Sequence, residues 1–239
     1  MTTIAENLQL IHRRMAQACA DAQRPSDSVA LLAVSKTFPA DAVREAALAG
    51  QRAFGENYIQ EGVDKIAQLR AMADVPQSVW HCIGPIQSNK TRLVATHFDW
   101  VHTVDRLKIA QRLSEQRPAE LAALQVCIQV NVDGGETKSG CSPEEALALA
   151  QAITALPQLQ LRGVMSIPDP QATPEAMLAV HRKVAAVFAQ IQGSGLPGLE
   201  AFDTLSLGMT DDLELAVAAG STMVRVGSGV FGRRSYPTA

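Results

Sequence analysis

A single lysine follows the first apolar run of the chain, in the stretch LLAVSKTFP. Lys36 comes directly after residues 29–35, which have the length and composition of a buried strand. Burial favours the neutral form of a lysine amine, and a neutral amine can attack a carbonyl carbon to form an imine. Lys36 therefore indicates a ligand that carries a carbonyl. The alternative is an ordinary solvated strand end, since most lysines are exposed.

Two late segments have the composition of an anion site. The stretch LSLGMTDDLELAVAAG runs through Ser206, Gly208 and Thr210 into a predicted helix, whose first amides and positive dipole end favour an anion. The stretch VRVGSGVFG adds the backbone amides of residues 227–229 and the hydroxyl of Ser228. Glycine-rich loops are often simple turns, but these two follow the last two predicted strands. That position is typical of a phosphate site in a barrel of alternating strands and helices.

Arg225 alternates with Val224 and Val226, so its side chain faces away from theirs. If the valines pack against helices, Arg225 points into the mouth of the barrel, where a buried charge needs an acceptor. A pyridine nitrogen or a carboxylate of the ligand would serve. A structural pair with Asp203 or Glu56 is equally compatible with the spacing.

These residues depend on a repeated alternation of apolar and helical segments. After an amphipathic helix over residues 3–22, about eight strand-helix units follow, which predicts a (β/α)8 barrel, with a doubly wound open sheet as the alternative. The predicted strands are 29–35, 52–56, 79–84, 98–103, 124–132, 159–167, 204–208 and 223–229. No linker interrupts the series, so we expect one domain over 1–239, divided into an N-terminal helix at 1–25, a barrel at 29–234 and a tail at 235–239.

Composition excludes several other classes of protein. The chain has 239 residues, 47% of them hydrophobic, and a net charge of -3, which argues against nucleic-acid binding. No apolar run is long enough for a membrane span and MTTIAENLQL lacks the pattern of a signal peptide, so we expect a cytoplasmic protein. The cysteines and histidines lack ligand spacing, and no metal is expected. The four cysteines are predicted to be reduced: Cys19, Cys82, Cys127 and Cys141.

Six separated segments together resemble one known family. They are LLAVSKTFP, FGENYIQE, WHCIGPIQSNK, VNVDGGETKSG, LRGVMSIP and LSLGMTDDLELAVAAGSTMVRVGSGVFG. In this order they resemble the YggS/PROSC family of pyridoxal-phosphate homeostasis proteins, over residues 29–234. The resemblance is specific because six motifs occur in the right order.

The resemblance implies a barrel similar to the amino-terminal domain of alanine racemase. It implies that pyridoxal 5'-phosphate (PLP) is held as an imine on Lys36, with Asn57 beside the cofactor ring and Arg225 facing the pyridine nitrogen. By the same resemblance, the phosphate would be bound by Ser206, Thr210, Gly227 and Ser228.

The function implied by the resemblance is that of a PLP carrier in vitamin B6 and amino-acid homeostasis, without catalytic turnover. PLP-dependent apoenzymes would be its recipients. We expect a monomer, because the dimer of the racemases buries a domain that this sequence does not show. One alternative is a racemase-like PLP enzyme, although its only tyrosines, Tyr58 and Tyr236, are predicted in a helix and in the tail. Another is a sugar-phosphate enzyme that uses Lys36 for imine chemistry. The sequence leaves open the roles of His81, Glu56, Lys90 and Lys138.

Overall fold

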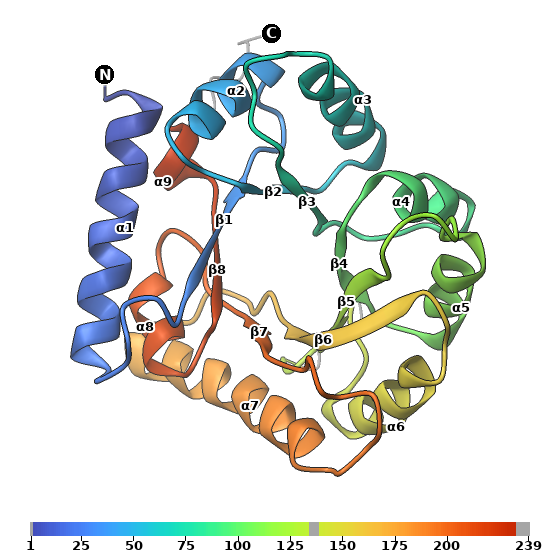
Figure 1. The fold of residues 1–239 in the computed structure, drawn as a ribbon. Helices are drawn as coiled ribbons and strands as arrows, with labels where there is room; N and C mark the ends of the chain where they lie inside the picture. The colour runs from blue at the N-terminus through green and yellow to red at the C-terminus, as the bar shows by residue number, and fades with distance from the viewer. Residues whose placement is uncertain (1, 134–138, 233–239) are drawn as a thin grey trace, which may run out of the picture.

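Eight parallel strands form a closed barrel in the computed structural model, which describes residues 2–133 and 139–232 (Figure 1). Each strand pairs with the next along the chain, and β8 returns to β1 with Arg225 opposite Leu32. The predicted (β/α)8 barrel is therefore confirmed, and the alternative of an open doubly wound sheet is wrong. The strands are β1 (Ala30–Val34), β2 (Ala53–Glu56), β3 (Val79–Cys82), β4 (Trp100–Val104), β5 (Leu124–Gln129), β6 (Leu159–Met165), β7 (Thr204–Ser206) and β8 (Met223–Val226).

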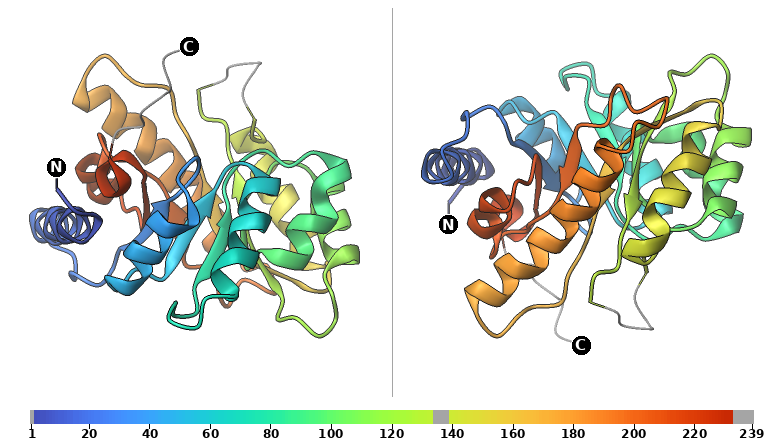
Figure 2. Two further views of the ribbon diagram at one scale, coloured as in Figure 1. Left: turned by 90° about the horizontal axis from the view of Figure 1, so that it is seen from above. Right: turned by 90° about the horizontal axis from the view of Figure 1, so that it is seen from below.

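Helices surround the barrel on its outside (Figure 2). Their ends follow local sequence signals: Ser142 and Glu145 form a capping box at the start of α6, and Gly50 and Gly220 take positive φ angles just after α2 and α8. The helical segments are α1 (Ile4–Asp21), α2 (Ala40–Leu48), α3 (Ile59–Arg70), η1 (Ser88–Lys90), α4 (Thr91–His97), α5 (Leu107–Gln116), α6 (Pro143–Thr154), α7 (Pro174–Gln192), α8 (Leu213–Ala218) and α9 (Ser228–Phe231).

The two faces of each strand belong to different environments. Leu31 packs in the large core cluster between the strands and the helices, whereas Leu32 belongs to a small cluster on the opposite face, inside the barrel. Because Arg225 lies opposite Leu32 in the register, it also faces the interior. Val224 and Val226 lie in the outer core cluster. The alternation that predicted an inward arginine is thus present.

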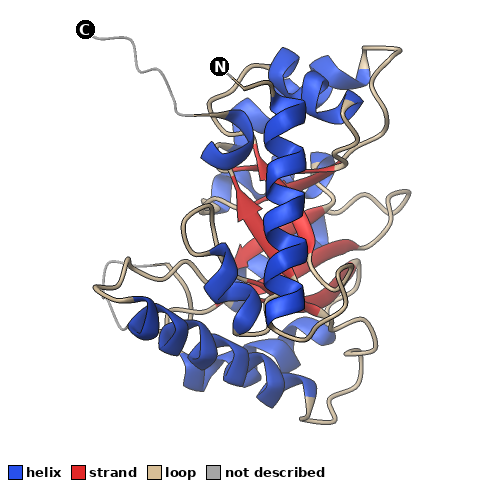
Figure 3. Cartoon of the chain, turned by 90° about the vertical axis from the view of Figure 1, so that its left-hand side faces the viewer, coloured by secondary structure: helices blue, strands red, loops and turns tan. Residues whose placement is uncertain are grey.

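The first helix crosses the outside of the barrel (Figure 3) and packs against α2, α8 and α9. Asn7 Nδ2 donates to the backbone oxygen of Val230 at 2.9 Å. Arg14 donates to the backbone oxygen of Thr210 at 2.9 Å and forms an ion pair with Glu214 at 2.7 Å. The helix therefore contacts the segments that follow both β7 and β8.

Among the described residues, no helix combines the length and apolar character needed to cross a membrane.

Truncation of Ile11 should loosen the docking of α1. Ile11 is 1% exposed, so Ile11→Ala removes buried methyl groups and leaves a cavity. We expect the free energy of unfolding, measured by urea titration, to fall by about 2–5 kcal/mol. Leu10, which is 49% exposed on the same helix, provides the control variant Leu10→Ala. Equal losses for the two variants would contradict this account of the packing.

Candidate functional site

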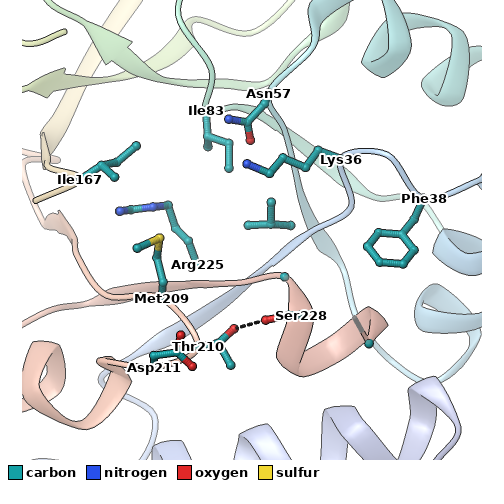
Figure 4. A pocket seen from close by; sticks show the side chains of 13 residues that line it. Lys36, Phe38, Asn57, Ile83, Ile167, Met209, Thr210, Asp211, Arg225 and Ser228 are labelled. Atoms are coloured by element: carbon teal, nitrogen blue, oxygen red, sulfur yellow. Dashed lines mark hydrogen bonds between the residues drawn. The ribbon is translucent and has the colours of Figure 1, made fainter. Parts of the chain in front are cut away.

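A cavity of about 280 Å³ opens where the strands end. Its lining residues follow the carboxyl ends of β1, β2, β3, β6, β7 and β8, which is the functional end of barrels of this type. Figure 4 shows the Lys36 side chain pointing into this cavity, with Asn57 on one side and Arg225 on the other. The lining is formed by Val34, Lys36, Phe38, Asn57, Ile83, Ile167, Met209, Thr210, Asp211, Arg225, Gly227, Ser228 and Gly232.

The backbone on both sides of Lys36 is held by side chains of β2 and α3. On one side, Ser35 donates its hydroxyl to Glu56 Oε1 at 2.6 Å, and its backbone oxygen accepts from Lys65 Nζ at 2.9 Å. On the other side, the backbone N–H of Thr37 donates to Glu61 Oε1 at 2.6 Å. Thr37 has a φ of 67°, in the left-handed region that is unfavourable for a β-branched residue. These contacts hold the chain in the conformation that directs Lys36 into the cavity.

The contacts of Ser35 and Thr37 meet at a buried ion pair between Lys65 and Glu56. Lys65 Nζ lies 2.6 Å from Glu56 Oε1 and 3.1 Å from Glu61 Oε1, and the side chains of Lys65 and Glu56 are only 5% and 0% exposed. Burial raises the pKa of the Glu56 carboxyl, while the charge and hydrogen bond of Lys65 act in the opposite direction. Of the roles that the sequence left open for Glu56, the structure shows the salt bridge.

Asn57, which follows β2, lies beside Lys36, and its backbone packs directly against Gly84, which follows β3. A side chain at Gly84 would place its Cβ 2.0 Å from the backbone oxygen of Asn57, so only glycine fits there. In the described part of the chain, Asn57 Oδ1 is buried and accepts no hydrogen bond. A buried acceptor without a donor is costly, so this oxygen indicates a ligand with a donor group.

The predicted anion end is formed by two loops that contact each other. Thr210 Oγ1 lies 3.2 Å from Ser228 Oγ and accepts from the backbone N–H of Gly229 at 3.3 Å (Figure 4 shows the first contact). Gly227 lines the cavity next to them. The site thus brings together hydroxyl groups and backbone amides, which suit a phosphate. The exposed carboxylate of Asp211 also borders this end.

Arg225 is 4% exposed and is held by neutral acceptors. Nη1 donates to the backbone oxygen and the hydroxyl of Ser206 at 2.6 and 2.9 Å, and Nη2 donates to the backbone oxygen of Ser166 at 2.8 Å. The alternative carboxylate partners are wrong, because Asp203 pairs with Arg162 and Glu56 with Lys65. Burial lowers the pKa of Arg225 to about 10, so it is still charged near neutral pH.

Ser206 does not lie with the other residues expected at the phosphate. It is fully buried, is not part of the cavity lining, and its hydroxyl contacts Arg225 and His102. The reason is the direction of its side chain: as the last residue of β7, Ser206 turns into the barrel, whereas Thr210 lies in the loop above. The expectation that Ser206 contacts a phosphate is corrected to a contact with Arg225.

The other polar residues considered from the sequence lie outside this cavity. His81 and His102 are buried inside the barrel, 2.9 Å apart at Nδ1 and Nε2, and Lys90 lies in η1. Lys138 falls outside the described residues.

All four cysteines are buried and reduced, and burial raises the pKa of the Cys141 thiol to about 12, which makes it a poor nucleophile. No group of three potential metal ligands occurs among residues 2–133 and 139–232.

Sequence reasoning missed the residues that support Lys36. Lys65 stands three residues after Gly62 and four before Leu69, on the buried face of α3. This spacing is the signal that could have shown its burial, although it does not show which groups Lys65 contacts. The apolar wall residues Ile83 and Ile167 lie at the ends of predicted strands and gave no chemical signal. The closed barrel brings them to the same cavity as Lys36.

The fold and the lysine at the end of β1 define the class of the protein. A family model described as the N-terminal domain of alanine racemase matches residues 3–235. Alanine racemase from Corynebacterium glutamicum has the same fold, with a TM-score of 0.68 and 18% identity over 97% of this chain and 61% of that chain. The class is therefore that of alanine-racemase-type barrels.

Two further proteins identify the family within this class. A protein of Pseudomonas aeruginosa named "Pyridoxal phosphate homeostasis protein" is 55% identical over 236 residues, which cover 99% of this chain and 98% of the relative. The structure of PipY from Synechococcus elongatus PCC7942 with PLP bound has a TM-score of 0.81 and 38% identity, covering 96% of this chain and 100% of PipY. The chain belongs to the family of pyridoxal phosphate homeostasis proteins, which confirms the YggS/PROSC resemblance.

Removal of the buried ammonium group should destabilise the fold in a pH-dependent way. Lys65→Met leaves the Glu56 carboxylate buried without a counter-ion, and we expect a loss of about 3–5 kcal/mol in the free energy of unfolding near neutral pH. Without Lys65, the pKa of Glu56 in the folded protein rises further above its unfolded value. Between the pKa of Glu56 in the unfolded variant and its higher pKa in the folded variant, the free energy of unfolding falls as pH rises. The destabilisation relative to the wild type should therefore be smaller at about pH 5 than at about pH 8.

Urea titrations at the two pH values measure this difference. Lys108→Met, on the exposed face of α5, is the matched control and should change stability little. The double variant Lys65→Met with Glu56→Gln removes both charges and should recover part of the loss. A loss for Lys65→Met that is equal at both pH values would contradict the assigned role of Glu56.

Proposed function

We propose that this protein binds PLP, holds it as a Schiff base on Lys36, and serves vitamin B6 and amino-acid homeostasis as a carrier without catalytic turnover. One observation carries the proposal: a single cavity contains an amine, a charged guanidinium and an anion-binding end. The names of the relatives support it, since the Pseudomonas protein is named for PLP homeostasis and PipY was determined with PLP bound.

The residues present fit this cofactor. The volume of about 280 Å³ is close to the lower end of small-molecule sites, and Ile83 and Ile167 provide apolar walls for a flat ring. The hydroxyls and amides of Thr210, Ser228 and Gly227 suit a phosphate. The buried acceptor Asn57 Oδ1 would receive a hydrogen bond from the ring hydroxyl, which satisfies it.

Lys36 would provide the covalent attachment. In its unprotonated form, the Lys36 amine would hold PLP through an imine to the aldehyde carbon, with the aldehyde oxygen and the two amine hydrogens lost as water. The contacts of Ser35 and Thr37 with β2 and α3 hold the backbone on both sides of Lys36 before the ligand arrives. The backbone of Lys36 would therefore need little rearrangement when its amine reacts.

Arg225 would lie opposite the ring nitrogen and limit the chemistry. When bound, PLP acts as an electron sink, and it does so best with a protonated ring nitrogen. The charge of Arg225 disfavours that protonation, because its pKa of about 10 keeps it cationic near neutral pH. This favours holding the cofactor over turnover.

Among the described residues that line the cavity, none is a tyrosine, histidine or cysteine. Asp211 is the one carboxylate among these described residues, and it lies beside Thr210 at the anion-binding end rather than beside Lys36 (Figure 4). Tyr58 directly precedes α3 rather than lying within it, and is 57% exposed outside the lining. Tyr236 falls outside the described residues. The carrier role is thus preferred over a racemase-like enzyme, while PLP-dependent apoenzymes as recipients, the monomeric state and the cytoplasmic location stay predictions.

Replacement of Lys36 should abolish the covalent attachment. With PLP added, the wild-type protein should absorb in the visible region typical of an imine, and borohydride should fix the cofactor on the peptide that contains Lys36. Lys36→Ala should lose both signals, whereas Lys108→Ala, on the exposed face of α5, should keep them. A borohydride adduct on another residue of the wild-type protein would overturn the proposal.

Loss of the Thr210 hydroxyl should weaken binding of the phosphate selectively. Thr210→Val removes a group in the anion end, and one hydrogen bond to a charged group is worth roughly 1.5–3 kcal/mol, so we expect PLP affinity to fall about tenfold or more. Affinity for pyridoxal, which has no phosphate, should change little. Thr96→Val on the exposed surface of α4 is the control. Equal losses for PLP and pyridoxal would contradict the assignment of Thr210.

A further inference from the structure

A buried chain of hydrogen bonds connects Arg225 to two histidines across the inside of the barrel. Arg225 Nη1 donates to Ser206 Oγ at 2.9 Å, Ser206 Oγ lies 3.1 Å from His102 Nδ1, and His102 Nε2 lies 2.9 Å from His81 Nδ1. Each of the four residues is at most 4% exposed. The chain links β8, β7, β4 and β3 and ends at an arginine that lines the cavity.

The chemistry of the groups fixes the direction of the first bond and is consistent with one direction through the other two. A guanidinium only donates, so the Ser206 hydroxyl accepts from Arg225 and its own hydrogen is available for His102 Nδ1. His102 then carries its proton on Nε2 and donates to His81 Nδ1. Burial lowers the pKa of His81 to about 3, and burial together with His81 and Arg225 lowers the pKa of His102 well below its usual value. Both rings are therefore neutral, as this chain of donors and acceptors requires.

The last residue of this series of hydrogen bonds, His81, packs against aromatic and charged side chains deeper in the barrel. His81 stacks on Trp100 with ring centroids 5.1 Å apart, and the guanidinium of Arg162 lies 4.6 Å from the Trp100 ring centroid. Arg162 in turn forms an ion pair with Asp203 at 2.6 Å. Rotation of either histidine would disturb this stacked arrangement, so the two rings are held in place.

We propose that His102, supported by His81, is a positioning residue that orients Arg225 through the hydroxyl of Ser206. The inference rests on the proposed function, in which Arg225 faces the ring nitrogen of PLP. Arg225 has no carboxylate partner in its described contacts, so the direction of its guanidinium depends on neutral acceptors. A serine hydroxyl rotates freely unless an acceptor holds its hydrogen. His102 supplies that acceptor, which turns a lone pair of Ser206 toward Arg225.

The pH titration of bound PLP, followed by absorbance, tests this role. Arg225→Leu serves as the reference, because loss of the guanidinium permits protonation of the ring nitrogen and shifts the titration midpoint of the bound chromophore. His102→Phe removes the acceptor while it fills the space of the ring. We expect it to shift the midpoint in the same direction as Arg225→Leu, by at least half as much. His102→Asn keeps an oxygen near the position of Nδ1 and should restore the wild-type midpoint.

Two further variants separate positioning from general loss of stability. Ser206→Ala breaks the same chain with a smaller change, so it decides the matter if His102→Phe does not fold, and it should give the same shift. Thr91→Val removes a fully buried hydroxyl that contacts Ser88 and Gln116, far from the cavity, and should leave the midpoint unchanged. A shift in Thr91→Val as large as in Ser206→Ala would overturn the positioning role.

The remaining outcomes distinguish this inference from the proposed function. If Arg225→Leu shifts the midpoint but His102→Phe and Ser206→Ala keep the wild-type value, the positioning role is wrong while PLP binding stands. If Arg225→Leu leaves the midpoint unchanged, although borohydride fixes PLP on Lys36, Arg225 does not face the ring nitrogen and the inference fails with that assignment. If borohydride fixes no PLP on Lys36, the proposed function itself is wrong.

Discussion

The buried ion pair between Lys65 and Glu56 is the interaction on which the site depends. It joins the ends of β1 and β2 to α3, since Lys65 Nζ contacts Glu56, Glu61 and the backbone oxygen of Ser35. Such a pair adds little net stability, because removing two charges from water costs about as much as their attraction returns. Its value is geometric: few other arrangements of these strands and this helix would satisfy both charges. The backbone that carries Lys36 is held by the same contacts.

Buried polar groups also restrict the geometry inside the barrel, on β3, β4, β7 and β8. Barrels of this type are usually filled by layers of branched apolar residues. Here Arg225, Ser206, His102 and His81 occupy interior positions, each with a described partner. A satisfied polar network makes the interior specific and rigid, whereas a half-satisfied one is costly. The arrangement therefore places at the cavity floor a cation whose described hydrogen bonds all go to neutral acceptors, while the charge of Asp212 favours its protonated form.

Periodicity predicted the series of strands and helices and most residues that end the strands, but it left an open doubly wound sheet as the alternative to the closed barrel. The alternation of Val224, Arg225 and Val226 correctly placed Arg225 inside, and Lys36, Asn57, Thr210, Gly227 and Ser228 do line one cavity. The partners of these residues could not be predicted, because they depend on register and distance between segments far apart in the chain. Ser206 shows the limit: it belongs to the glycine-rich segment in sequence but to the barrel interior in space. Lys65 is a second case: its helical spacing places it on the buried face of α3, but the spacing cannot show that Ser35 and Glu56 are its partners.

The first helix has a consequence for ligand exchange. Asn7 and Arg14 reach the backbone oxygens of Val230 and Thr210, so one external element touches both loops of the anion-binding end. Docking of this helix and affinity for a dianion are then thermodynamically linked: whatever free energy the docked helix adds to ligand affinity, the ligand returns to helix docking. Where the docked helix adds to ligand affinity, displacement of the helix from the barrel surface would weaken ligand binding without any change inside the cavity.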